Sequence, residues 1–160
     1  MSALAIIKRA ELVAVGRSWV RTPFRHQARL KGAGVDCANL IIAVGEVCGV
    51  LALDPNLWRR YEGYGRLPNP RRMREALATF LHSIAAGDAG DGDVAWLQWR
   101  QDLPMHLAIA ATFDGRRTII HAYAGVKEVV EHGLTAEWEN RIESWWRYPG
   151  LAELLAREAA

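Results

Sequence analysis

Residues 107–123 read LAIAATFDGRRTIIHAY, two apolar runs on either side of an Asp-Gly pair. An Asp-Gly pair between two such runs predicts a β-hairpin, because both residues tolerate the backbone of a tight two-residue turn. We therefore expect antiparallel strands at 107–111 and 118–123. When the chain folds back around this turn, His121 on the second strand lies roughly beside Ala108 on the first.

Helical patterns precede the hairpin. Residues 4–20 carry apolar side chains at helical spacing, and Thr22-Pro23 ends the pattern because a residue before proline avoids helical geometry. A second helix is predicted from Cys37 to about Val47, with Asp36 as its cap and a glycine after its last turn. A third is predicted from Pro70 to about Ala86.

The remaining expected elements are short and follow an irregular connection at 54–69. They are strands at 94–97, 126–131 and 145–148 and helices at 134–141 and 151–158. Helices first and consecutive strands afterwards predict an α+β fold with an antiparallel sheet. A length of 160 residues suits a single domain that spans 1–160.

Composition and charge exclude several classes of protein. Half of the residues are apolar, so the chain is not disordered, and a formal net charge of +2 gives no electrostatic reason to expect nucleic acid as a partner. No apolar run is long enough for membrane insertion. Charged residues at positions 8, 9 and 11 interrupt the place where a signal peptide has its apolar stretch, so we expect a protein made in the cytoplasm without a signal peptide.

Cys37 is the main candidate for a catalytic residue. The run Gly34-Val35-Asp36-Cys37 puts this cysteine in the first turn of the second helix. A helix N-terminus carries about half a positive charge, which favours the thiolate and lowers the pKa of a cysteine there. The free backbone N–H groups of that turn can also stabilise an oxyanion. The other interpretation is a small buried cysteine; Cys48, at the far end of the same helix, fits that interpretation better.

Two histidines are expected to act with this cysteine. His106 opens an apolar strand after a proline, where an imidazole can reach toward a helix N-terminus and take a proton from a thiol. In the hairpin register His121 is a diagonal neighbour of His106 on the same face, where it can orient the first ring by hydrogen bonding. A zinc site made of Cys37, His106 and His121 is the alternative, since zinc accepts these ligands.

Several motifs in the same order resemble the NlpC-like cell-wall cysteine peptidases. They are Arg21-Thr22-Pro23-Phe24-Arg25-His26, Gly34-Val35-Asp36-Cys37, Gly92-Asp93-Val94, His106-Leu107-Ala108-Ile109 and Ile120-His121-Ala122, within about residues 18–130. The resemblance implies a papain-like fold in which the cysteine helix packs on an antiparallel sheet that carries both histidines. It also implies cleavage of amide bonds in peptidoglycan stem peptides, with Cys37 as nucleophile, His106 as base and no metal or cofactor.

The resemblance also suggests substrate-binding residues. In this family the aspartate before the cysteine helps to recognise the free amine of the stem peptide, and Asp36 matches that position. Phe24 stands where the family has tyrosine, so a hydroxyl near the cleft is missing, and His26 or Tyr64 are candidates to replace it. Ala38 and Asn39 replace the family's Ser-Gly, which leaves open whether a free N-terminal L-alanine is strictly required.

A narrower resemblance concerns residues 25–32, 131–134 and 145–149. These segments are similar to the cell-wall peptidases encoded among phage-tail and gene-transfer-agent genes. This implies other tail or particle proteins as partners, and a phage-like particle that brings the enzyme to the periplasm and cell wall of the next cell. Two alternatives remain: an inactive structural tail or hub component that reuses the peptidase fold, and a host enzyme for wall remodelling or amide transfer.

Overall fold

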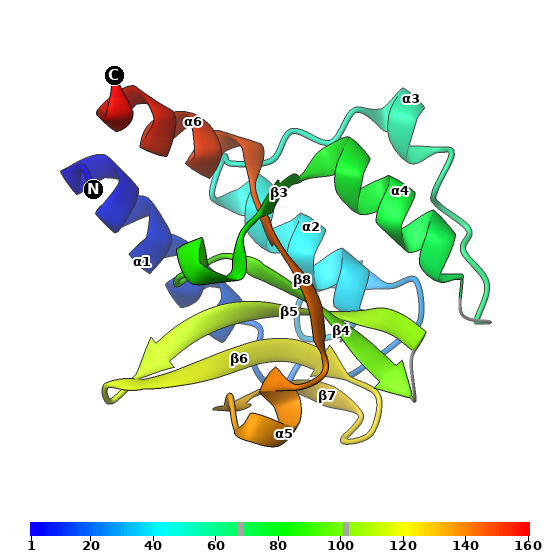
Figure 1. The fold of residues 1–160 in the computed structure, drawn as a ribbon. Helices are drawn as coiled ribbons and strands as arrows, with labels where there is room; N and C mark the ends of the chain where they lie inside the picture. The colour runs from blue at the N-terminus through cyan, green and yellow to red at the C-terminus, as the bar shows by residue number, and fades with distance from the viewer. Residues whose placement is uncertain (67–68, 101–102) are drawn as a thin grey trace.

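The computed structural model describes residues 1–66, 69–100 and 103–160 and shows helices packed on an antiparallel sheet (Figure 1). The sheet has six strands in the order β3-β8-β4-β5-β6-β7. Their bounds are β3 His82–Ile84, β4 Val94–Arg100, β5 Leu103–Phe113, β6 Arg116–Tyr123, β7 Glu128–Gly133 and β8 Ile142–Arg147. A separate two-stranded sheet contains β1 Arg29–Leu30 and β2 Gly34–Val35. The predicted α+β fold class is confirmed.

The hairpin expected from the sequence forms between β5 and β6. Its register pairs Phe113 with Arg116 and Ile109 with Ile120, and the two turn residues 114 and 115 have φ angles of 51° and 72°. Continued by one residue, this register places His121 opposite Ala108, as the sequence predicts. The paired stretch ends at Ile109 and Ile120, before it reaches the level of His106.

Most helices lie on one face of the sheet (Figure 1). They are α1 Ala3–Arg17, α2 Cys37–Val47, α3 Pro55–Trp58, α4 Pro70–Phe80 and α6 Pro149–Ala159. The larger apolar core, which includes Leu12, Leu40 and Ile109, fills the space between these helices and the sheet. The short helix α5, Ala136–Glu139, lies on the opposite side near β7, where a smaller apolar cluster includes Ala108 and Ile119. Within the described residues, no helix is both long enough and apolar enough to cross a bilayer.

Some element boundaries differ from the sequence prediction. The third helix ends at Phe80 rather than near residue 86, because residues 82–84 pair with β8 as an edge strand. This pairing joins segments about 60 positions apart and leaves no local pattern in the sequence. Residues 55–58 form one helical turn, capped by Asp54, within the connection expected to be irregular. The first helix ends at Arg17 instead of residue 20.

A buried ionic cluster around Asp93 joins the first helix to the sheet. Asp93 is fully buried, directly before β4, and accepts hydrogen bonds from Arg9 of α1 at 3.1 Å and from Arg147 of β8 twice at 2.8 Å. The backbone N–H of Gly90 donates a fourth bond at 2.8 Å. A buried carboxylate is tolerable only when it is paired in this way. The cluster fixes the start of β4, and β4 aligns the strand that carries His106.

Candidate active site

Cys37 is the first residue of α2, which packs against β5. Asp36 caps this helix by accepting a hydrogen bond from the backbone N–H of Asn39 at 2.9 Å. The sulfur of Cys37 lies close to the backbone N–H of Leu107, the residue directly after His106. The thiol therefore lies beside the peptide bond that joins His106 to Leu107, at the level where β5 is no longer paired with β6.

The pKa of the partly buried Cys37 is raised, contrary to the lowering expected from its position at a helix N-terminus. Burial raises the pKa of Cys37 to about 12, and the carboxylate of Asp36 acts in the same direction. The backbone N–H groups of Leu107, Ala38 and Cys37 itself lower the pKa but do not outweigh these two effects. The expectation was wrong because desolvation of the sulfur and a full negative charge on the adjacent residue exceed the partial charge of the helix end.

Three histidines on neighbouring strands form a continuous hydrogen-bonded chain. Nε2 of His106 lies 2.5 Å from Nδ1 of His121, and Nε2 of His121 lies 2.8 Å from Nε2 of His132. Nδ1 of His132 lies 3.0 Å from the carbonyl oxygen of Gly133. The predicted contact between His106 and His121 is confirmed. Among the described residues no group of three side chains is arranged to hold a metal, so the alternative zinc arrangement is not formed.

His106 and His121 are both buried and neutral. His106 is 3% exposed and His121 is 0% exposed. Burial lowers the pKa of His106 to about 3, with the positive charge of Arg141 and then His132 as further causes. Burial, followed by His106 and His132, lowers the pKa of His121 to about 2. An uncharged imidazole can accept a proton, so His106 is in the protonation state that a general base needs.

Nδ1 is the nitrogen of His106 that is not used in the line of imidazoles. Its Nε2 is engaged with His121, whereas Nδ1 has no hydrogen-bond partner among the residues that the structure describes. Nδ1 is also the ring nitrogen nearer the main chain, and the sulfur of Cys37 lies beside that stretch of main chain. A lone pair on Nδ1 would therefore be available to accept a proton.

The carboxylate of Asp36 is fully engaged inside the protein. Oδ1 accepts hydrogen bonds from the backbone N–H and the side-chain amide of Asn39, at 2.9 and 3.0 Å. Oδ2 accepts from the backbone N–H of Gln27 at 2.7 Å and from the hydroxyl of Tyr64 at 2.5 Å. Asp36 is only 3% exposed. A substrate amine would have to displace one of these donors, so amine recognition by Asp36 stays a prediction.

A tyrosine hydroxyl lies at the site even though residue 24 is phenylalanine. The hydroxyl of Tyr64 donates to Asp36 and accepts a hydrogen bond from the side-chain amide of Asn39 at 2.8 Å. Burial and then the Asp36 carboxylate raise the pKa of Tyr64, and Cys37 is close enough to contribute to the rise. Of the two candidates for a polar group in place of the missing tyrosine at residue 24, Tyr64 is the one whose hydroxyl contacts Asp36, the residue before Cys37.

Phe24 and His26 take supporting positions. Phe24 forms an isolated bridge with Val35, two residues before Cys37, and packs against the larger apolar core. The ring of His26 lies edge-on to the ring of Tyr64, with centroids 5.4 Å apart, and its Nε2 lies 3.1 Å from the Tyr64 carbonyl oxygen. These contacts hold the segment of Tyr64 against the loop before α2. A direct role of Phe24 in substrate binding stays a prediction.

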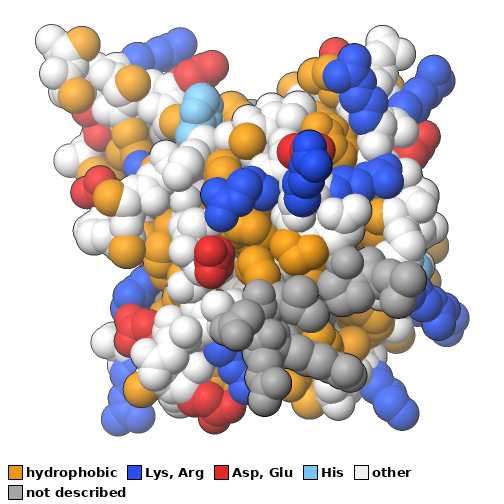
Figure 2. All heavy atoms as spheres, turned by 45° about the vertical axis from the view of Figure 1, so that its right-hand side comes forward, with side chains coloured by type: hydrophobic (Ala, Val, Ile, Leu, Met, Phe, Trp, Pro, Cys, Tyr) orange, Lys and Arg blue, Asp and Glu red, His pale blue; other side chains and the backbone are white. Residues whose placement is uncertain are grey.

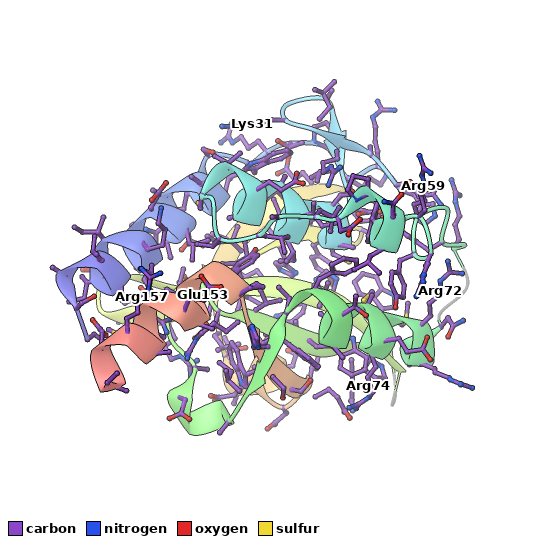
Figure 3. All side chains as sticks on the ribbon, turned by 90° about the horizontal axis from the view of Figure 1, so that it is seen from above. Lys31, Arg59, Arg72, Arg74, Glu153 and Arg157 are labelled. Carbon is purple, nitrogen blue, oxygen red and sulfur yellow. The ribbon has the colours of Figure 1, made fainter. Side chains whose placement is uncertain are left out.

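An apolar cavity of about 190 Å³ is lined by Ala38 and Leu107, the residues that follow Cys37 and His106 in the chain. The backbone N–H groups of these two residues approach the Cys37 sulfur. Its wall continues between α2, α3 and α4 with Trp58, Met73 and Phe80, and Arg72 lies at its lining as well. In Figure 3, Arg59 and Arg72 lie at the same end of the molecule. Figure 2 shows apolar surface directly below a group of basic side chains on this side. The cavity is large enough for an apolar group of a few atoms.

The sequence analysis assigned no role to His132, although a signal was present. His121 is opposite Val130 in the pairing of β6 with β7, so His132 is displaced from His121 by two positions on the same face. The same diagonal offset relates His106 to His121 across β5 and β6. The strand at 126–131 was expected but stopped one residue short of His132. Extending the hairpin register across the next strand would have found this third histidine.

The fold matches that of NlpC/P60 proteins. An NlpC/P60 family protein from Bacillus cereus ATCC 10987 aligns with a TM-score of 0.61 and 16% identity over 88% of this chain and 40% of that chain. A protein described as similar to lipoprotein, NLP/P60 family, from Staphylococcus aureus subsp. aureus Mu50 gives a TM-score of 0.59 and 14% identity over 89% and 41%. The NlpC/p60 domain of the peptidoglycan hydrolase SagA gives a TM-score of 0.52 and 17% identity. This alignment covers 86% of this chain and 97% of that chain.

These likenesses concern the fold, because the sequence identities are low. The present chain spans only about two fifths of the length of the first two proteins, at 40% and 41%. No protein-family model and no curated protein sequence matches the chain. The activity of this chain therefore has to be argued from its own residues.

Proposed function

We propose that this chain is a cysteine peptidase of the NlpC/P60 family that cleaves amide bonds in peptidoglycan stem peptides. The observation that carries the proposal is the position of the Cys37 thiol, at a helix N-terminus and beside the His106–Leu107 peptide bond. The chain of hydrogen-bonded imidazoles that begins at His106 supports it, because it supplies an oriented proton acceptor. The shared fold with a domain of a peptidoglycan hydrolase supports the choice of substrate.

In the proposed reaction His106 acts first as a base and then as an acid. The neutral thiol of Cys37 gives its proton to Nδ1 of His106 while the sulfur attacks the amide carbonyl carbon. Backbone N–H groups in the first turn of α2 stabilise the oxyanion. His106 then returns the proton to the leaving amine, the C–N bond breaks, and water hydrolyses the thioester on Cys37. The proton moves during the attack, because the pKa of Cys37 is raised and the pKa of His106 is lowered.

The shape of the site suggests which part of the substrate binds where. The apolar cavity beside Ala38 and Leu107 takes an aliphatic portion of the stem peptide. The polar side of the site is formed by Asp36, Asn39 and Tyr64, which are already bonded to one another. Because this network has its acceptors filled, we expect a weaker demand for a free N-terminal amine than in relatives with serine after the cysteine.

We further propose that the enzyme works as a component of a phage tail or gene-transfer-agent particle. Support comes from the similarity of residues 25–32 and 145–149 to tail-encoded peptidases. A protein made in the cytoplasm and assembled into such a particle would leave by lysis and meet the wall of the next cell from outside. Its partners would then be other tail or particle proteins, and its substrate the peptidoglycan of the recipient cell.

The proposed activity is tested with purified peptidoglycan sacculi. Wild type and Cys37→Ala are incubated with sacculi, and released fragments are identified by mass spectrometry. We expect stem-peptide fragments from the wild type and none from Cys37→Ala, with both proteins folded by far-UV circular dichroism. Cys48→Ala, the same change at the chain's other cysteine, serves as the matched control and should retain activity, since Cys48 lies at the opposite end of α2.

The result of this experiment, together with the reactivity of Cys37 and the place where the active protein is found, separates the alternatives. Fragments that appear equally with Cys37→Ala would refute cysteine catalysis. A folded wild type that releases nothing, and whose Cys37 does not react with a thiol reagent even at high pH, would support the structural tail or hub component. Recovery of the active protein from periplasm without any particle would favour the host enzyme instead.

A further inference from the structure

We propose that His132 is a positioning residue that sets the proton arrangement of the other two histidines, with the backbone carbonyl of Gly133 as its anchor. The inference rests on the proposed peptidase function for its catalytic meaning, but its structural content can be tested without any substrate. His132 does not touch the thiol; it acts on His106 only through His121.

The geometry places one histidine on each of three adjacent strands. His106 lies on β5, His121 on β6 and His132 on β7, and each is displaced by two positions from the next across the sheet. Successive rings contact each other edge-on, with centroids 4.8 Å and 4.9 Å apart. Such diagonal neighbours on one sheet face are close enough for their side chains to interact. The three rings therefore form one line of hydrogen bonds that ends at Gly133.

The anchor determines the direction of every hydrogen bond in this line. A carbonyl oxygen can only accept, so Nδ1 of His132 carries the proton that points at Gly133. In a neutral ring the other nitrogen then has the lone pair, so Nε2 of His132 accepts from Nε2–H of His121. Nδ1 of His121 is then the acceptor for Nε2–H of His106.

The consequence at the end of the line is a lone pair on Nδ1 of His106. This is the nitrogen that has no partner among the described residues and that the thiol proton needs. If the line ran in the opposite direction, Nδ1 of His106 would carry a proton and could not accept one from Cys37. A single backbone carbonyl on β7 therefore selects the tautomer that suits a general base, two side chains away.

Side chains of α5 and of the residue that follows its C-cap lie next to this line of rings. The ring of Trp138 from α5 packs against both His121 and His132, with centroids 5.2 Å and 4.9 Å away. The guanidinium of Arg141 lies 4.6 Å from the centroid of the Trp138 indole, and its positive charge opposes protonation of His106. A water molecule that replaced His132 could donate as well as accept, so it would not impose a direction on the line.

The first test reads the tautomers directly. In the wild-type protein, two-dimensional ¹⁵N–¹H spectra of the histidine rings at neutral pH should show Nδ1–H for His132 and Nε2–H for both His121 and His106. A proton on Nδ1 of His106 in the wild type would overturn the proposal. This measurement needs no substrate, so its result stands whether or not the protein cleaves peptidoglycan.

The second test compares two substitutions of the same residue. His132→Leu removes the acceptor, so we expect mixed tautomers at His106. On fragments of sacculi we also expect kcat to fall by roughly 10- to 100-fold with little change in KM, the range for residues that orient a functional side chain. His132→Gln keeps an acceptor oxygen near the position of Nε2, so it should largely restore both the wild-type tautomer of His106 and the wild-type kcat. His82→Leu, a change at an exposed histidine of β3, is the matched control and should alter neither.

The outcomes distinguish this inference from the proposed function. Unchanged His106 tautomers and unchanged kcat in His132→Leu would refute the positioning role. An altered tautomer in His132→Leu, combined with a wild type that is inactive on every peptidoglycan substrate, would uphold the positioning role and refute the peptidase. If His132→Leu does not fold, the wild-type spectrum and His132→Gln still decide the question.

Discussion

At the scale of single residues, the site combines a neutral thiol with neutral imidazoles. The pKa of Cys37 is raised to about 12 and the pKa of His106 is lowered to about 3, so the surroundings of both groups favour their uncharged forms. Many reactive cysteines are activated instead by a lowered pKa. Here activation depends on a proton acceptor held in place, and the arrangement of His121 and His132 behind His106 provides it.

The protonation state of Cys37 predicts how the thiol reacts with alkylating reagents. Reaction with iodoacetamide, followed by peptide mass spectrometry, should accelerate about tenfold per pH unit between pH 7 and 10 without reaching a plateau, because the thiolate fraction keeps rising below the pKa. Glutathione measured in parallel gives the behaviour of an ordinary thiol, which levels off near its own pKa. A plateau for Cys37 below pH 8 would contradict the neutral resting state.

The two histidines nearest the thiol should differ in importance. His106→Ala removes the proton acceptor and should abolish stem-peptide cleavage, whereas His121→Ala removes only the group that orients it and should leave measurable activity. Initial rates on sacculi, with circular dichroism to verify folding, measure the difference. Equal and complete loss in two folded variants would refute this ranking.

At the scale of secondary-structure elements, the site depends on how α1, β4 and β8 are joined. Asp93 pairs with Arg9 and Arg147 and so links the first helix to two neighbouring strands. β4 in turn pairs with β5, where His106 lies opposite Leu97 and Leu107 lies opposite Trp96. The buried carboxylate therefore supports the strand that carries His106, the proposed base, about a dozen residues along the chain.

Removal of this carboxylate should be costly. Asp93→Ala leaves two largely buried arginine side chains without their partner, and we expect a loss in the free energy of unfolding of about 3–5 kcal/mol, as for other broken buried pairs. Urea denaturation followed by tryptophan fluorescence measures it. Glu75→Ala breaks the exposed pair with Arg71 and should cost less than about 1 kcal/mol. Similar losses in both variants would contradict a special role for the buried cluster.

At the scale of the whole molecule, the buried histidines couple folding to pH. The pKa of His106 falls to about 3 and that of His121 to about 2 in the folded protein, whereas in the unfolded chain both have ordinary values near 6.5. At pH values between the folded and the unfolded pKa of each histidine, the unfolded state binds more protons than the folded state. Stability is therefore greatest above about pH 6.5 and falls as the pH decreases toward 3.

This coupling predicts a measurable loss of stability in mild acid. Between pH 7 and pH 5 each of the two histidines should reduce the free energy of unfolding by about 2 kcal/mol. The window lies above the range in which carboxylates titrate, so the lowered pKa of Glu131 does not contribute there. Urea titrations at several pH values measure the slope, and His121→Gln should remove about half of it. A wild-type stability that stays constant from pH 7 to 5 would show that these rings are not held neutral.

The amino-acid sequence by itself determined the features that depend on local chemistry. The Asp114-Gly115 turn and the apolar runs around it defined the register of β5 and β6, and that register brought His106 and His121 together. The capping residue Asp36 placed Cys37 at the start of α2. Turn and cap preferences act over a few neighbouring residues, so they can be read along the chain.

Only the tertiary structure decided the features that depend on what surrounds a residue in space. The thiol pKa follows from burial and from Asp36, and burial is produced by elements far apart in the sequence. The edge strand at 82–84, the hydroxyl of Tyr64 beside Asp36, and the contact of His132 with His121 likewise arise from long-range packing. Desolvation and long-range hydrogen bonds depend on three-dimensional distances, and these exist only once the sheet has assembled.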